Sequence, residues 1–167
     1  MARPPARRLT REETSELSRV TQLRHPQILA VARGADDVVI LLPDRMVIRR
    51  PRGWEMVAWQ DIQRGGFSDA GELSWELTDG TKRTAIIDDV AIVPRAFQEL
   101  IRSSIIVSRR MELTGGLGSV MISGRRSPTG DGAVSWQTEA LGRCNLSDSA
   151  VQSQVLELVA RMRAEFE

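Results

Sequence analysis

The chain has 167 residues, a length that fits one domain or one domain with a small appendage. Its composition, 41% hydrophobic and 27% charged, is typical of a globular chain that can bury a core without disulfides or metals. The 23 basic and 22 acidic residues leave a net charge of +1, which argues against a dedicated nucleic-acid binder, because such proteins usually carry a clear excess of positive charge.

The N-terminal segment, residues 1–24, is expected to form an arm and a short helix. Its first eight residues are rich in proline and arginine, which indicates a mobile arm. Thr10 and Glu13 have the spacing of a capping box, in which each side chain accepts a hydrogen bond from the backbone N–H of the other residue. The pattern predicts a helix over residues 11–21 that ends before Pro26.

From residue 27 the hydrophobic period changes to that of short strands separated by tight turns. The stretch "RGGFSDAG" is expected to be a loop. In the strand "ELSWELT" that follows, Leu73, Trp75 and Leu77 face one way and polar residues face the other. Asp79–Gly80 then has the composition of a hairpin turn. We expect an antiparallel meander of six strands, over residues 27–33, 38–42, 46–50, 54–62, 72–78 and 82–88.

A helix is expected over residues 93–104, where Phe97 and Ile101 share one face and can close the open end of the curled sheet. Three further strands are predicted in "SIIVSRRMEL", "SVMISGRRS" and "AVSWQTEAL". The last stretch, "SDSAVQSQVLELVARMRAEF", has a helical apolar stripe and offers Ser147 or Asp148 as its N-cap. Because this second meander looks too small to bury a core alone, we expect it to pack on the preceding unit.

The run "VVILLPDRMVIRRPRGWEMVAWQDI", followed by "ELSWELTDGTKRTAIID" and a helix, resembles the bacterial pleckstrin-homology-like domains. Arg45 occupies the turn position where that family carries an arginine. Val57–Ile62 matches its apolar-Trp-acidic-acidic-Ile segment, with Gln60 in place of one acid. The whole chain also resembles small actinobacterial proteins with no assigned activity. The resemblance implies a scaffold, an open β-barrel closed by a helix, and little about function, because such barrels serve varied roles.

The expected fold class is therefore α+β, an antiparallel pleckstrin-like open β-barrel closed by a helix, with a C-terminal three-stranded meander and a terminal helix. We expect three parts along the chain. Residues 1–24 form the arm and the short helix, residues 25–106 form the barrel and its helix, and residues 107–167 form the meander and the terminal helix.

Residues that could carry chemistry are sparse. His25 and Cys144 are single occurrences, so a pair between them is the only nucleophile and base that can be drawn, and a surface histidine with a partly buried cysteine is the simpler interpretation. The stretch "TGGLGS" lacks the lysine of a phosphate-binding loop and leads into a strand, which indicates a hairpin turn. Asp36–Asp37 and Asp88–Asp89 lack the spacing of a calcium loop and suit turns. We predict no catalytic residue, no metal site and no cofactor.

Clustered arginines supply the candidates for binding. Adjacent arginines in a strand point to opposite faces, so each pair places at most one on a shared surface. Arginines opposed across the second hairpin would be unfavourable unless an acidic partner intervened, and salt bridges to Glu112 and Glu139 are the alternative. The aromatic candidate follows a turn, where it could be exposed and make a contact. The candidates are Arg50, Arg52 and Trp54 at one rim of the barrel, and Arg109, Arg110, Arg125 and Arg126 in the second meander.

The function we expect is that of a non-enzymatic interaction module, which binds a protein partner or a second copy of itself through barrel loops, an edge strand or the terminal helix. The alternative is an anion-binding module for acidic phospholipid or RNA through the arginine clusters, with an affinity that falls steeply with salt. Peripheral membrane contact belongs to that alternative, and the balanced charge disfavours nucleic acid. A single cysteine favours a cytoplasmic location. We expect no secretory signal and no transmembrane segment, since the longest apolar run is "VVILLP".

Overall fold

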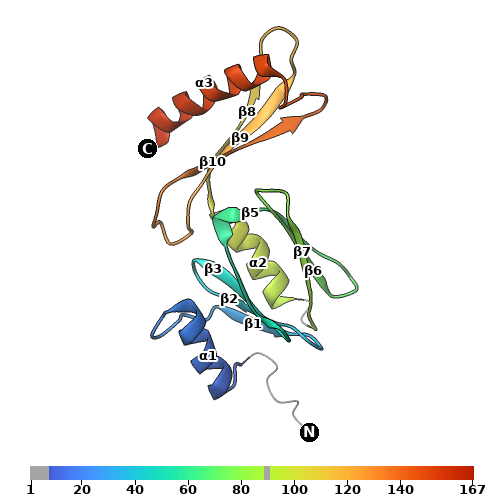
Figure 1. The fold of residues 1–167 in the computed structure, drawn as a ribbon, viewed down its shortest axis with the longest axis vertical. Coiled ribbons are helices and arrows are strands. Elements are labelled where there is room, and N and C mark those ends of the chain that lie inside the picture. The colour runs from blue at the N-terminus through green and yellow to red at the C-terminus, as the bar shows by residue number, and fades with distance from the viewer. Residues whose placement is uncertain (1–7, 89–90) are drawn as a thin grey trace. The chain divides into compact units, whose positions relative to one another are not determined.

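The computed structural model describes residues 8–88 and 91–167, and within them the chain forms three antiparallel sheets and three α-helices (Figure 1). The predicted α+β class is confirmed at this level. The chain divides into two units. The first comprises the residues up to Ser104 together with Ser127–Thr129, and the second comprises Ile105–Arg126 and Gly130–Glu167. Most of the predicted N-terminal arm lies outside the described residues.

The first unit contains two separate sheets rather than a closed barrel. A one-turn 3-10 helix at Trp59–Asp61 joins them, so the predicted strand over 54–62 is wrong as a single element. The predicted loop "RGGFSDAG" is also wrong in part, because its first residues belong to a strand with a bulge near Arg64. The first sheet has the order β1 (Ala30–Arg33), β2 (Val38–Leu41), β3 (Arg45–Arg50), β4 (Gly53–Ala58), and the second has the order β5 (Ile62–Phe67), β6 (Glu72–Leu77), β7 (Lys82–Ile86).

The core of the first unit lies between the two sheets and the helix α2 (Ile92–Ser103), which runs against both of them (Figure 1). Trp59 is fully buried there, and its indole Nε1 donates a hydrogen bond to the Leu42 carbonyl at 2.9 Å. Phe97 of α2 meets this ring edge-on, with 6.0 Å between the ring centroids. The predictions that Leu73 and Trp75 face the same way and that the helix face with Phe97 packs against the sheets are confirmed, and Trp59 joins them in the core.

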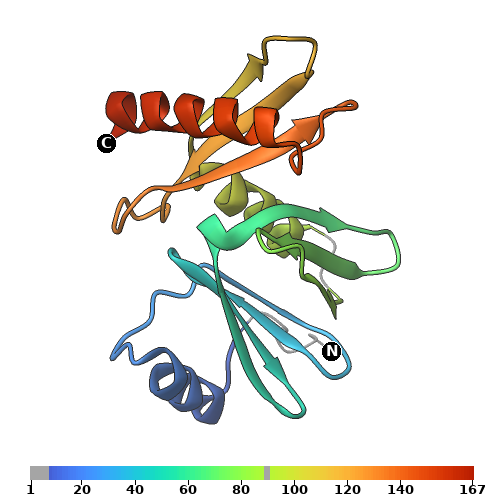
Figure 2. The ribbon, with the colours of Figure 1, turned by 45° about the horizontal axis from the view of Figure 1, so that its top comes forward.

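Helix α1 (Arg11–Thr21) has the predicted bounds, and both hydrogen bonds of its capping box, between Thr10 and Glu13, are present. It lies on the face of the first sheet opposite to α2 (Figures 1 and 2). Leu17 of α1 packs there on apolar side chains that alternate with the core residues along the strands. The sheet is therefore buried on both faces, which explains the continuous apolar run of β2.

The second unit is a three-stranded sheet with one helix, α3 (Ser149–Phe166), across one face (Figure 2). Asp148 caps this helix by accepting a hydrogen bond from the Ala150 N–H. Buried residues from the sheet and from α3 form a hydrophobic cluster of the unit's own. The predicted hairpin turn in "TGGLGS" is confirmed by the hydrogen bond from the Leu113 N–H to the Gly118 carbonyl at 2.8 Å. The strand order is β10 (Ser135–Leu141), β9 (Ser119–Arg125), β8 (Ile105–Glu112).

Candidate functional site

Arg50, at the end of β3, is held in place by three groups of the first unit. Its guanidinium donates to the carboxylates of Glu55 at 3.0 Å and Asp37 at 3.2 Å, and to the Thr84 carbonyl at 2.9 Å. The last of these bonds connects the first sheet to β7 of the second. Because its donors are directed at these partners, Arg50 has a structural role that competes with binding an external anion.

The other two candidates at this rim differ in exposure. Arg52 is exposed in the turn between β3 and β4. Trp54 is half-buried rather than exposed, because it packs at the edge of the cluster under α1 and its Nε1 donates to the Glu16 carboxylate at 3.2 Å. Arg49 donates to the same carboxylate, also at 3.2 Å. The aromatic residue at this rim therefore helps to hold α1.

In the second unit, the side chain of Arg109 binds the C-terminal end of α3. Its guanidinium makes two hydrogen bonds to the Glu165 carboxylate, at 2.7 and 2.6 Å, and lies 5.1 Å from the centroid of the Phe166 ring. These bonds raise the pKa of Arg109 and lower the pKa of Glu165. Trp136 adds a hydrogen bond from its Nε1 to the Glu167 carboxylate at 2.8 Å.

The two arginine pairs of this unit are not opposed across the hairpin, so that expectation is wrong. Arg109 pairs with Ile122, and Arg110 pairs with Met121, whereas Arg125 lies further along β9, opposite Ile105 and Ser135. The reason is the position of the turn, which fixes the register. These arginines therefore do not repel one another across the hairpin, and the register gives no reason to expect an acidic partner there.

The remaining contacts of these arginines are varied. Arg110 donates to the Glu112 carboxylate at 3.3 Å and to the Ser119 hydroxyl at 3.2 Å, as the salt-bridge alternative predicts for Glu112. Arg125 is buried, and burial lowers its pKa. Arg126 follows β9 and is half-buried. The structure thus brings Arg109 and Arg110 to acidic residues of the chain itself.

The residues considered for catalysis or metal binding lie in ordinary positions. His25 is exposed in the segment between α1 and β1, and Cys144 packs at the edge of the hydrophobic cluster of the second unit. Among residues 8–88 and 91–167, no three His, Cys, Asp or Glu side chains gather closely enough to hold a metal ion. In the same part of the chain, no helix has the length and apolar character needed to cross a bilayer.

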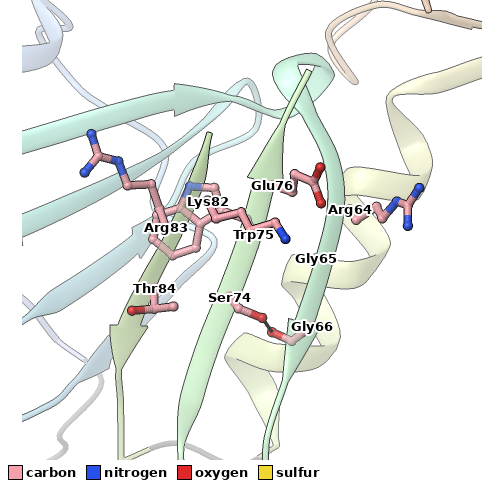
Figure 3. Close-up of a pocket in the computed structure, with 9 residues that line it drawn as sticks. All are labelled: Arg64, Gly65, Gly66, Ser74, Trp75, Glu76, Lys82, Arg83 and Thr84. Atoms are coloured by element: carbon pink, nitrogen blue, oxygen red, sulfur yellow. Dashed lines mark hydrogen bonds between the residues drawn. The ribbon is translucent and has the colours of Figure 1, made fainter. Parts of the chain in front are cut away.

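The site that the sequence did not indicate is an open groove of about 340 Å³ on the second sheet, lined by residues of all three strands (Figure 3). The register places Gly66, Ser74 and Thr84 in one row across the outward face, away from the core residues Leu73 and Trp75. The Ser74 hydroxyl lies 3.5 Å from the Gly66 carbonyl, at the limit of a hydrogen bond (Figure 3). The next row of the groove consists of Arg64, Glu76 and Lys82.

Two consecutive glycines form the floor of the groove, and only one of them is required by the fold. Gly65 faces the core, where a Cβ would lie 2.7 Å from the Ile101 Cδ1 and closer still to the Phe97 ring. A Cβ on Gly66 would meet only the Ser74 hydroxyl, at the ordinary contact distance of 3.4 Å, and Gly66 does not have a positive φ. Glycine inside a strand that no packing requires often marks a place where a ligand or another backbone approaches closely.

Sequence reasoning missed this groove because it assigned the glycine pair to a loop. The alternation in "ELSWELT" did place Ser74 and Glu76 on the outward face, but it could not supply the strand on either side of them. The sequence did offer one indication of this strand. Ile62 and Phe67, the apolar residues on either side of the glycines, are the first and last residues of β5.

Comparison of the chain with models of known protein families, with curated proteins and with solved structures found no match.

Proposed function

We propose that this chain is a non-enzymatic interaction module on a pleckstrin-like scaffold, and that it docks an extended segment of a partner protein in the groove on the second sheet. The scaffold part of the proposal is supported by the two antiparallel sheets with α2 packed against both, and by the Trp59 that the resemblance identifies. Such scaffolds have varied roles, so the function is argued from the groove.

The observation that carries the proposal is Gly66. Glycine in the middle of a strand costs about 0.5–1 kcal/mol relative to alanine, and here neither the backbone conformation nor the packing calls for it. Its effect is to leave the backbone of β5 bare at the floor of the groove. A polypeptide backbone can approach such a floor more closely than it could approach a row of side chains.

The walls of the groove are mostly apolar, and their few polar groups can orient a bound peptide. Ser74 and Thr84 offer hydroxyls that can both donate and accept hydrogen bonds. In the next row Glu76 lies between Arg64 and Lys82, so the row carries two positive charges and one negative. A peptide that carries both an acidic and a basic side chain would be complementary to this row.

The test is a selection of short random peptides, displayed on phage, against the full chain, followed by fluorescence anisotropy with the purified peptides. We expect Gly66→Val to weaken binding by at least about tenfold, because its side chain fills the floor. Glu72→Val is the matched control, since Glu72 lies on the same face outside the groove, and it should bind like the original chain. Peptides that bind Gly66→Val as well as the original chain would remove the support for this site.

The anion-binding alternative receives less support. Arg50, Arg109 and Arg110 are directed at carboxylates of the chain itself, and an external phosphate would have to compete with those partners. Flotation with acidic vesicles at low and high salt tests it. Strong binding at low salt that disappears at high salt would favour this alternative over the groove.

A further inference from the structure

We propose that the outward face of the first sheet is a docking surface for α1 that accepts the α1 of a second copy of this chain, so that two copies associate by exchanging the helix. The inference rests on observations in and around α1, and it is independent of the groove on the second sheet.

Few apolar contacts hold α1 in place. Leu17 is its only hydrophobic side chain that is buried, and Leu9, just before the helix, packs partly against the same cluster. By contrast, the sheet under α1 is apolar across three strands. The face is therefore one that must be covered, and it is covered by a small helix. The buried residues of the sheet in this cluster are Val31, Val38, Ile40, Leu42 and Val47.

Charge complementarity identifies which helix the face accepts. Arg33 of β1 donates two hydrogen bonds to the Glu13 carboxylate, one of them 2.8 Å long. Arg49 of β3 donates to the Glu16 carboxylate. The acids lie on the helix and the bases on the sheet, so the α1 of a second copy would form the same ion pairs.

The segment between α1 and β1, residues 22–29, is suited to act as the hinge. Within the part of the chain that the structure describes, residues 24–28 make no hydrogen bond. Gln22 has a φ of +58°, a conformation that is unfavourable for a residue other than glycine. Opening the segment therefore loses little besides the contacts of α1, which the exchanged pair forms again.

The same segment offers apolar surface that a second copy could cover. Leu23, Ile28 and Leu29 are 36%, 37% and 44% exposed. When two copies exchange a helix, their two hinges run close to the symmetry axis, and apolar side chains on them become able to pack against each other. This surface distinguishes a second copy of the chain from an unrelated helix, which would leave it exposed.

A charge-reversal experiment tests the exchange. Glu13→Arg and Arg33→Glu each break the ion pair within one chain, but an exchanged pair containing one copy of each variant has matched charges at both helices. We expect the two variants to be mostly monomeric when they are separate and to form a dimer when they are mixed in equal amounts, as measured by size-exclusion chromatography with light scattering. The double variant, matched within one chain, is the control and should behave like the original chain.

A second measurement applies even where reversed charges are not tolerated. Deleting Arg24–Gln27 shortens the hinge by up to roughly 14 Å, so that α1 can no longer reach its own sheet, and we expect a stable dimer. An insertion of four Gly/Ser residues at the same place should give a monomer. Two results would overturn the proposal. One is a deletion variant that stays monomeric over the whole concentration range. The other is a mixture of the two charge variants that contains only the two monomers, although the double variant behaves like the original chain.

Discussion

The two sheets of the first unit have opposite kinds of outward face. On the first sheet this face is apolar, with Val31, Ile40 and Val47 in one row across three strands, and α1 covers it. On the second sheet the corresponding face has Gly66 and Ser74 in its middle and is open as a groove. The sheets belong to one unit and share one core, so the difference lies in the residues that face away from that core.

The comparison separates stability from recognition. An apolar outward face is stable in water only when something covers it, so each contact of α1 contributes to the folded state. A face of hydroxyls and bare backbone needs no cover, and substitutions there cost the fold little. We therefore expect changes under α1 to alter stability and changes in the groove to alter binding.

The largest effect on this comparison should come from Leu17→Ala. Leu17 is fully buried between α1 and the first sheet, and its truncation leaves a cavity over an apolar face. The free energy of unfolding of the first unit should fall by about 2–5 kcal/mol. Leu156→Ala is the control, because Leu156 is 71% exposed, and it should change stability by less than about 0.5 kcal/mol. Urea denaturation of both variants measures the difference. An equal loss of unfolding free energy in the two variants would mean that Leu17 does not stabilise the first unit by covering the sheet.

Acid should weaken the covered face next. The hydrogen bonds from Arg33 lower the pKa of Glu13 from 4.5 to about 2, while burial opposes them. Because the folded-state pKa lies below the unfolded one, the ion pair stabilises the unit fully above pH 4.5, and this contribution is lost as the pH falls toward 2. It amounts to about 2 kcal/mol once solvent screening of the partly exposed Arg33 is allowed for.

The comparison between the original chain and Glu13→Gln isolates this contribution from other acids. The original chain should lose its stability advantage over the variant between pH 4.5 and 2, as followed by thermal unfolding at several pH values. If the unfolding temperatures of the two proteins fell in parallel over that pH range, the ion pair would contribute nothing to stability.

A smaller effect is expected where the second sheet meets the core. Gly65→Ala forces a methyl group against Phe97 and Ile101, both of which are buried. Overpacking of this kind costs about 1–3 kcal/mol. The unfolding temperature should fall, and an unchanged temperature would mean that α2 can shift away from β5 at no cost.

The smallest effect on stability is expected at Gly66, and it has the opposite sign. Gly66→Ala places its methyl group in the groove, where the space is available, and should stabilise the first unit by about 0.5 kcal/mol. The same denaturation experiment as for Gly65→Ala measures it. A loss of stability as large as that of Gly65→Ala would mean that Gly66 is required by the fold and would remove the argument for the groove.

Local patterns in the sequence predicted the elements well. Thr10 with Glu13 defined the start of α1, and the helix stripe that contains Phe97 placed α2, because caps and helical periodicity are encoded within a few residues. The strand β5 was missed because Gly65 and Gly66 have the composition of a loop. The reason for the first glycine is its contact with Phe97, which lies 32 residues away and cannot be inferred from the local pattern.

The candidate site was harder to predict because it depends on partners that are distant in the sequence. The arginines were identified as a group, but the acids that bind them, such as Glu165 for Arg109, are far along the chain. Register has the same difficulty. The turn before β9 moved Arg125 away from Arg109 and Arg110, and only the paired strands show by how much.

The contacts that Arg109 and Trp136 make with the last residues of α3 should restrict the motion of that helix end. Helix ends ordinarily fray, and their amide hydrogens exchange with solvent quickly. Here Glu165, Phe166 and Glu167 are each held by a side chain of the sheet. The last turn of α3 should therefore retain its amide hydrogens longer than the last turn of α1, and Arg109→Ala should abolish that protection in a deuterium-exchange measurement.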